Sequence, residues 1–239
     1  MTLSYIAHLE EALRLNPPPK KGLRTKEKIK ISTARILEEK GYHNLRVIDI
    51  TNDANIAEGS FYFYYKDKAE VTLDVLTGLL NEFFNLQSRS RSDSTAFGAI
   101  QAANRRWIAV CRSNSGLMRC ILQFSDEEPA FGVLGQRSNR QWYDLIADSV
   151  LRRQGGDRQA VLLAAYMLGA MMDELVRKLV IYPDPELQAL LDELDADDDA
   201  VADAASVIWL KVLYPLERPA ADLPQAAERL AAALWPPGR

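Results

Sequence analysis

The sequence predicts an all-α protein, and three observations support this. Apolar residues recur at helical spacing along most of the 239 residues. No segment shows the alternation of a strand or the Asn-Gly signal of a hairpin. The 11 prolines cluster at the ends of the chain and in breaks between apolar stretches, where they separate helices. The predicted architecture is a three-helix helix-turn-helix domain followed by a larger helical domain.

The first elements follow from periodicity and from the residues that end helices. Residues 1–16 are expected to form a short amphipathic helix that ends at three prolines. Residues 25–40 form the next helix, and Gly41 is expected to end it in the left-handed conformation. Two short helices follow at 47–54 and 58–64.

Asn55 separates these two short helices, because asparagine tolerates a positive φ. Asp67 is a suitable N-cap for a fourth helix, which stops in the polar run at residues 88–94. The later helices are expected at 95–113, 116–125, 130–154, 158–181, 199–214 and 223–235.

Composition excludes several classes of protein. Two cysteines and two histidines offer no metal-ligand spacing, and the sequence has no nucleophile elbow or phosphate-binding glycine loop. We therefore expect no enzyme, no metal and no cofactor. The start of the chain lacks an export signal, and the longest apolar run, residues 160–172, is shorter than the about 20 residues of a membrane span. The expected protein is cytoplasmic, and that run is expected to be a buried helix.

Charge is distributed unevenly along the chain, whose net charge is −4. Residues 20–35 carry seven basic side chains and one acidic side chain, which predicts an anion-binding surface. Residues 182–203 carry nine acidic side chains and no basic one. Nucleic acid would therefore meet the amino-terminal part and be repelled by the later segment.

Residues 41–71 carry the strongest functional signal. The two short helices would pack Val47, Ile50 and Ala54 against Phe61, which leaves small, hydroxylic and aromatic side chains outward. Such a face suits the major groove of DNA, where aromatic edges contact thymine methyl groups and a serine hydroxyl reaches a phosphate or a base. We interpret Phe61 and Tyr65 as core residues.

This segment resembles the TetR/AcrR (tetracycline-repressor) family of transcriptional regulators. The resemblance covers about residues 25–72, in the order Gly41-Tyr42, 47–50, 59–65 and Asp67-Lys68. It implies a homodimer that binds operator DNA and a small-molecule effector. The implied domains are an extension at 1–22, a DNA-binding domain at 23–70 and a ligand-binding and dimerisation domain at 71–239.

Carried over onto this sequence, the resemblance implies that Ser60 contacts the DNA backbone or a base and that Phe63 sits at the groove. It implies phosphate contacts for Tyr62 and for Lys68 at the start of the fourth helix. Two departures concern the helix starts: Arg46 replaces a capping Ser or Thr, and Ala57-Glu58 replaces a Ser-Lys pair. A third concerns the turn, where Asn55 replaces a Gly. The residues expected to face DNA are Arg24, Lys26, Arg46, Ile48, Glu58, Gly59, Ser60, Tyr62, Phe63, Tyr64, Lys66 and Lys68.

The remainder of the chain concentrates aromatic and methionine side chains, which form adaptable apolar cavities between helices. The residues expected to contact a small, mainly apolar effector are Phe83, Trp107, Met118, Phe124, Trp142, Tyr166 and Met171. Asp173 and Glu174 are interpreted as a solvated helix end, and an anchor for a cationic or hydroxylated ligand is the alternative.

Two helices, at 158–181 and 199–214, are apolar on most of their surface, so a four-helix bundle across a two-fold axis is expected to form the dimer. The main hypothesis is a ligand-responsive repressor released from a palindromic operator. The alternative is a helical ligand-binding or interaction protein whose helix-turn-helix is vestigial. Glu58 and the net negative charge favour that alternative.

Overall fold

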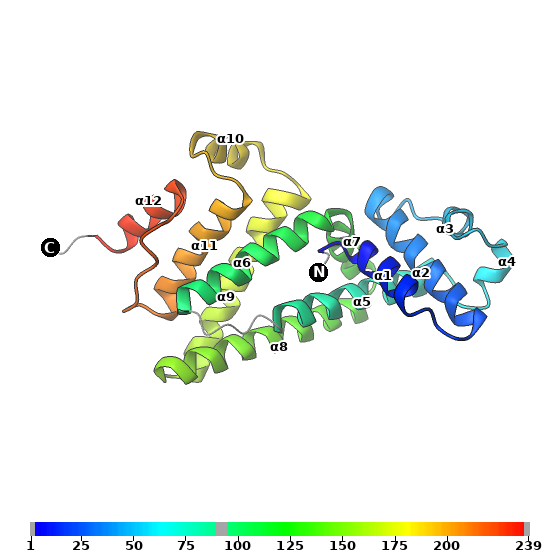
Figure 1. Cartoon of the computed structure of the whole chain (residues 1–239), viewed down its shortest axis with the longest axis horizontal. Coiled ribbons are helices and arrows are strands. Elements are labelled where there is room, and N and C mark those ends of the chain that lie inside the picture. Colours follow the sequence, from blue (N-terminus) through cyan, green and yellow to red (C-terminus); the bar gives the residue numbers. More distant parts are fainter. Residues whose placement is uncertain (1–2, 89–94, 237–239) are drawn as a thin grey trace. The chain divides into compact units, whose positions relative to one another are not determined.

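The computed structural model describes residues 3–88 and 95–236, and every regular element in these ranges is a helix (Figure 1). The predicted all-α class is therefore confirmed. The chain divides into two compact units: unit 1 comprises Met1–Phe84 and Ser113–Ser138, and unit 2 comprises Asn85–Arg112 and Asn139–Arg239. The domain boundaries expected from the sequence stay a prediction.

Unit 1 is built around α2, which packs against α1, α3 and α7. Fully buried apolar side chains from four helices, including Ile29, Ile50, Phe61 and Leu76, form its core. The helices of this unit are α1 (Tyr5–Leu15), α2 (Lys21–Lys40), α3 (Val47–Ala54), α4 (Glu58–Phe61), all but the last turn of α5 (Lys68–Ser88), α7 (Ser115–Glu127) and the first turns of α8 (Pro129–Gln154).

Unit 2 is built around α11, which packs against α9 and α12. The buried carboxylate of Asp203 on α11 accepts two hydrogen bonds from Arg105 on α6, at 2.7 and 2.5 Å. The helices of this unit are α6 (Ala96–Ser113), the rest of α8, α9 (Arg158–Val176), the π-helix η1 (Arg177–Ile181), α10 (Pro185–Glu193), α11 (Asp198–Leu213) and α12 (Gln225–Leu234).

Most predicted helices occur within a few residues of their expected bounds. Three features differ from the predictions. Helix α10 was missed, although Asp184 caps it by accepting from the backbone N–H of Glu186 and Pro185 occupies its first turn. Helix α4 ends at Phe61 rather than at residue 64, because the N–H of Tyr64 donates to Phe61 over three residues and tightens the chain into a turn. Gly41 has φ 75° and ψ 170°, so its φ is positive as expected but its ψ lies outside the left-handed helical region.

The stretch Arg158–Ile181 is long and apolar enough to cross a membrane by length and composition alone. A core helix of a soluble protein passes the same test. The sequence predicted a buried helix here, but only 28% of its most apolar window is buried within the chain, and Leu163 and Met167 are 58% and 64% exposed. This helix therefore presents an uncovered apolar face in the single chain.

The end of α5 coincides with the start of the predicted polar break. Ser88 is the last residue of that helix. The rest of the predicted break, residues 89–94, lies outside the described residues.

Candidate nucleic-acid interface

The turn between α3 and α4 depends on Asn55. This residue adopts φ 52° and ψ 55°, the left-handed conformation expected from the sequence. Its backbone N–H donates to Asn52, and the N–H of Ile56 donates to Thr51 at 3.0 Å. The chain therefore leaves α3 sharply, and α4 packs against α3 as the second helix of a helix-turn-helix.

The first residues of α3 and α4 lack side-chain caps, as the departures at Arg46 and Ala57 predict. Both positions are extended and exposed. An uncapped helix start leaves backbone N–H groups available, and these groups bind anions such as phosphate. Arg46 therefore stands beside free donors at the start of α3.

Helix α4 and the turn after it separate a buried side from an exposed side. Phe61 is fully buried, while Tyr62 is 54% and Phe63 85% exposed. A Cβ added at Gly59 would meet no atom within 4 Å, so the backbone of α4 is open to close approach. The Tyr62 ring packs edge-on against Phe61 at 5.4 Å between centres, yet more than half of its surface is exposed. The exposed aromatic pair next to an open glycine matches the outward face predicted from the sequence.

A partly buried polar cluster holds the chain after α4. The Tyr65 hydroxyl donates to Asp74 Oδ2 at 2.7 Å, and Lys30 Nζ donates to Asp74 Oδ1 at 3.0 Å. Burial raises the pKa of the Asp74 carboxyl, but the hydrogen bonds from Tyr65 and Lys30 outweigh it, so the net pKa lies below its ordinary value. Burial, with the hydrogen bond to Asp74, raises the pKa of Tyr65. Helices α2 and α5 thus fix the aromatic segment 61–65 through one carboxylate.

Three cations expected at the DNA backbone bind partners within unit 1. Arg24 donates to the carbonyls of Pro18 and Pro19 at 2.9 and 3.0 Å. Lys26 lies 3.8 Å from Asp74 and 5.1 Å from the centre of the Tyr65 ring. Lys68 donates to the carbonyl of Tyr42 at 3.3 Å and lies over the Tyr42 ring. A phosphate would compete with these contacts, and the role of the three residues at DNA stays a prediction.

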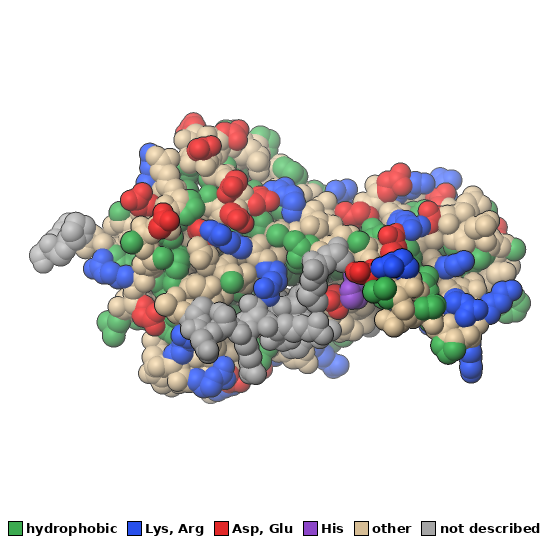
Figure 2. Space-filling model, in the orientation of Figure 1, with side chains coloured by type: hydrophobic (Ala, Val, Ile, Leu, Met, Phe, Trp, Pro, Cys, Tyr) green, Lys and Arg blue, Asp and Glu red, His purple; other side chains and the backbone are tan. Residues whose placement is uncertain are grey.

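Other basic side chains of the amino-terminal patch are exposed. Lys20, Lys21 and Lys28 have no ion pair among the described residues, and neither has Lys66, which follows α4. Figure 2 shows basic side chains gathered over the part of unit 1 that carries α2 and α4. Lys20, Lys21 and Lys28 were part of the predicted anion-binding surface, but they were not singled out as contacts.

The remaining expected DNA contacts differ in exposure. Ile48 on α3 is 45% exposed, and Glu58 at the start of α4 is exposed. Ser60 is half-buried. Tyr64 is half-buried because it packs beside Gly22 of α2, where an added Cβ would lie 3.4 Å from its hydroxyl oxygen.

The residues expected to bind an effector fall in both units. Phe83, Met118 and Phe124 belong to the core of unit 1, where the Phe124 ring packs edge-on against Tyr42 and Phe131 at 5.0 and 5.3 Å between centres. Unit 2 contains Trp107, Trp142, Tyr166 and Met171. The effector role of these seven residues stays a prediction.

The two acidic residues near the end of α9 have different surroundings. Glu174 forms an ion pair with Arg177, as suits a solvated helix end. Asp173 is accessible to water, yet desolvation by surrounding protein atoms raises the pKa of its carboxyl to about 6. The solvated-end interpretation therefore fits Glu174 better than Asp173.

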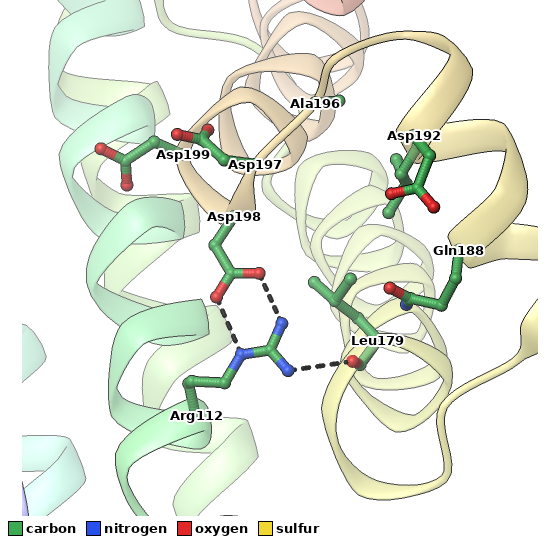
Figure 3. Close-up of a pocket in the computed structure, with 9 residues that line it drawn as sticks. Arg112, Leu179, Gln188, Asp192, Ala196, Asp197, Asp198 and Asp199 are labelled. Carbon is green, nitrogen blue, oxygen red and sulfur yellow. Dashed lines mark hydrogen bonds and ion pairs between the residues drawn. The ribbon is translucent and has the colours of Figure 1, made fainter.

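A pocket of about 430 Å³ lies in unit 2 among α6, η1, α10 and the start of α11 (Figure 3). Arg112 crosses it, donating to Asp198 at 2.9 and 2.5 Å and to the carbonyl of Leu179 at 3.2 Å. None of the seven expected effector residues lines this pocket. Among the described residues, no group of three or more His, Cys, Asp or Glu side chains is arranged to hold a metal ion.

These features define the class of the protein: an all-helical protein whose helix-turn-helix presents an exposed aromatic face next to basic side chains. The family model of bacterial regulatory proteins of the tetR family matches residues 32–75, which run from the second half of α2 into α5. Over this segment the match confirms the resemblance to the tetR family that the sequence predicted.

A curated relative also matches part of the chain. The HTH-type transcriptional regulator YuxN of Bacillus subtilis is 30% identical over 80 residues, a match that spans 31% of this chain and 28% of YuxN. The chain thus matches less than a third of that relative's length.

Solved structures resemble the chain over a larger part of its length. A transcriptional regulator from Rhodococcus sp. Rha1 has a TM-score of 0.64 at 16% identity and covers 78% of this chain and 96% of its own. FadR from Bacillus subtilis, solved in complex with stearoyl-CoA, has a TM-score of 0.58 at 16% identity over 77% and 96%. The fatty acid degradation regulator FadR from Bacillus halodurans has a TM-score of 0.57 at 14% identity over 81% and 96%. At these identities the likeness shows a shared fold.

Proposed function

We propose that this protein is a ligand-responsive repressor in the cytoplasm that binds a palindromic operator as a homodimer. The observation that carries the proposal is the exposed face at Gly59, Tyr62 and Phe63, which lies in the segment that matches the tetR family model. A dimer would place two such faces about 34 Å apart, the spacing of successive major grooves.

The dimer would form through the uncovered apolar face of α9, which includes Leu163, Tyr166 and Met167. The sequence also predicted a contribution from the helix at 199–214. In the chain, however, α11 packs against α9 and α12, and Val212 is its exposed large apolar residue. We therefore assign the larger share of the dimer interface to α9 and leave to α11 the edge near Val212.

The effector is proposed to be a small, mainly apolar molecule. The shared fold with FadR in complex with stearoyl-CoA makes a long-chain acyl-CoA the first probe to use. A coupling of about 1 to 3 kcal/mol between the two sites would lower operator affinity about 5- to 150-fold. Equal operator affinity with and without a ligand that binds tightly would contradict the ligand-responsive part of the proposal.

The alternative is a helical ligand-binding protein whose helix-turn-helix no longer binds DNA. The internal contacts of Arg24, Lys26 and Lys68 and the exposed Glu58 favour this alternative. Glu58 would repel phosphate unless it accepts a hydrogen bond from a cytosine amino group.

Fluorescence anisotropy separates the two functions. The protein is titrated into the duplex upstream of its own coding region and into a scrambled duplex, each at two salt concentrations. A regulator binds the first duplex selectively, and its affinity falls steeply with salt because phosphate contacts release counterions. Weak and equal binding to both duplexes leads to a second titration, against duplexes selected from a random pool. Selective binding in neither titration would reject the regulator in favour of the alternative.

A further inference from the structure

Helix α1 precedes the segment that matches the tetR family model, and its first turn is anchored in the core of unit 1. The N–H of Tyr5 donates to Asn114 Oδ1 at 2.8 Å, and Asn114 Nδ2 donates to the carbonyl of Leu3 at 2.8 Å. Both Tyr5 and Asn114 are almost fully buried. One amide side chain at the start of α7 thus pairs with the backbone at the start of α1.

The Tyr5 side chain fixes the same turn against α5. It fits over Gly78, where an added Cβ would lie 3.3 Å from the Tyr5 ring carbon Cζ and closer still to the hydroxyl oxygen. Only glycine leaves room for this packing. Buried hydrogen bonds and a close ring contact together leave α1 little freedom to move relative to α2, α5 and α7.

From this anchored start, α1 reaches the helix-turn-helix through one guanidinium. Arg35 on α2 donates to Glu10 through Nε and Nη2, at 3.1 and 2.6 Å. Its third nitrogen, Nη1, donates to Asp53 on α3 at 3.0 Å. A planar guanidinium that binds two carboxylates at once fixes the direction between them. Arg35 therefore links α1 to α3 through α2.

Helix α3 is the short helix that this link restrains. It has only eight residues, begins without a side-chain cap and carries Arg46 and Ile48 on its exposed side. It also packs against α4, so a shift of α3 moves the aromatic face at Tyr62 and Phe63. An eight-residue helix is not stable by itself, and its position depends on such tertiary contacts.

We propose that Glu10, Arg35 and Asp53 are positioning residues through which α1 holds α3 and α4 in the orientation that binds DNA. The proposal rests on the proposed function only for the DNA step; the mechanical link is independent of it. None of the three residues needs to touch DNA. The residues before the family match thereby acquire a defined role.

Hydrogen exchange of the full-length protein tests the link without DNA. Glu10→Ala removes the contact to Arg35, and Glu11→Ala is a matched control, because Glu11 pairs with Arg14 on the same helix at 3.9 Å. Both variants lose the same charge from neighbouring positions, and both keep the buried anchor. We expect the amides of residues 47–56 to exchange about two- to fivefold faster in Glu10→Ala than in Glu11→Ala. Equal exchange in the two variants would overturn the proposal.

A double variant tests whether the two carboxylates act through the same guanidinium. Asp53→Asn alone is expected to loosen α3 by a similar factor. In the variant that combines Glu10→Ala with Asp53→Asn, the effects on exchange should not multiply, because both changes act on Arg35. Independent, fully multiplicative effects would show that Arg35 does not connect them.

The DNA step is measured with a duplex selected from a random pool by the wild-type protein. The readout is the affinity of each variant for the selected duplex divided by its affinity for a scrambled duplex. Both are measured at one salt concentration and well below the unfolding temperature. We expect Glu10→Ala to lower this ratio about threefold or more and Glu11→Ala to leave it unchanged. Should the ratio be the same in both variants, the positioning role is refuted. If wild type selects no duplex, the proposed function fails, and hydrogen exchange still decides on the link.

Discussion

Gly116 lies where α7 packs closely against the backbone of α2, and its replacement by alanine is expected to destabilise the protein. An added Cβ would lie 2.6 Å from Glu38 Cα and closer still to the Glu38 carbonyl oxygen, whereas ordinary contacts are 3.4–4 Å. These are backbone atoms, so no side-chain rotation relieves the overlap. The two helices would have to separate by about 1 Å.

The separation would also disturb a cap. Asn114 gives α7 no side-chain cap, and the Glu38 carboxylate accepts from the N–H groups of Gly116 and Leu117 instead, at 2.9 and 2.8 Å. Loss of a cap costs about 0.5–2 kcal/mol, and overpacking costs about 1–3 kcal/mol. Alanine gains about 1 kcal/mol over glycine in a helix. The net expectation for Gly116→Ala is a loss of about 0.5–4 kcal/mol in the free energy of unfolding.

Urea denaturation at neutral pH measures this effect, with Gly135→Ala as the control. An added Cβ at Gly135, on α8, meets no atom within 4 Å, so this variant should keep the helix gain and be up to about 1 kcal/mol more stable than wild type. A stability of Gly116→Ala at or above that of wild type would refute the close approach of α2 and α7.

Three further predictions concern the candidate interface. Tyr62→Ala should weaken binding to a selected duplex about tenfold and lower the urea midpoint only slightly, because the ring is more than half exposed and keeps one edge contact with Phe61. Lys68→Ala should weaken binding and lower the midpoint further, because Lys68 binds the carbonyl and the ring of Tyr42. Anisotropy and urea titration together check both variants, and unchanged DNA binding in both would remove these roles. Asn55→Ala should lower the free energy of unfolding by about 1 kcal/mol, and Asn55→Gly by much less, because φ is 52° at this position. Equal urea midpoints for the two variants would contradict the strained turn. The pKa of Asp74 is lowered in the folded state, so the carboxylate stabilises the fold fully above the ordinary pKa of an aspartate, and this contribution is lost as the pH falls through the lower folded value. The urea midpoint should therefore fall less between pH 7 and 3 in Asp74→Asn than in wild type. Parallel curves for the two proteins would argue against the cluster with Tyr65 and Lys30.

Local patterns were sufficient for the parts of the fold that depend on neighbours in sequence. The bounds of α3 and the left-handed Asn55 follow from periodicity and from the conformational tolerance of one side chain. The same rules could have found α10, because Asp184 followed by Pro185 is a helix start; the high density of acidic residues obscured it.

The partners of the basic residues could not be predicted in this way. Lys68 binds the carbonyl of Tyr42, 26 positions away, and Glu38 caps a helix 78 positions away. Sequence shows that a lysine is present, but its availability for phosphate depends on which carbonyl or carboxylate the fold brings to it. The amino-terminal patch is therefore divided: Lys21 and Lys28 are exposed, whereas Arg24 and Lys26 are held by the protein.

The apolar helices of unit 2 illustrate a further limit of periodicity. Both α9 and α11 are apolar on most of their surface, which indicates that other elements cover each helix on several sides. The pattern does not show whether those elements belong to the same chain or to a second copy. In the chain, α12 packs against α11, and Lys211 lies 4.5 Å from the centre of the Trp235 ring. Helix α9 keeps Leu163 and Met167 uncovered. The same apolar pattern thus reflects two different environments. Helix α11 is covered by its own chain, whereas α9 presents the face that we assign to contact with a second copy.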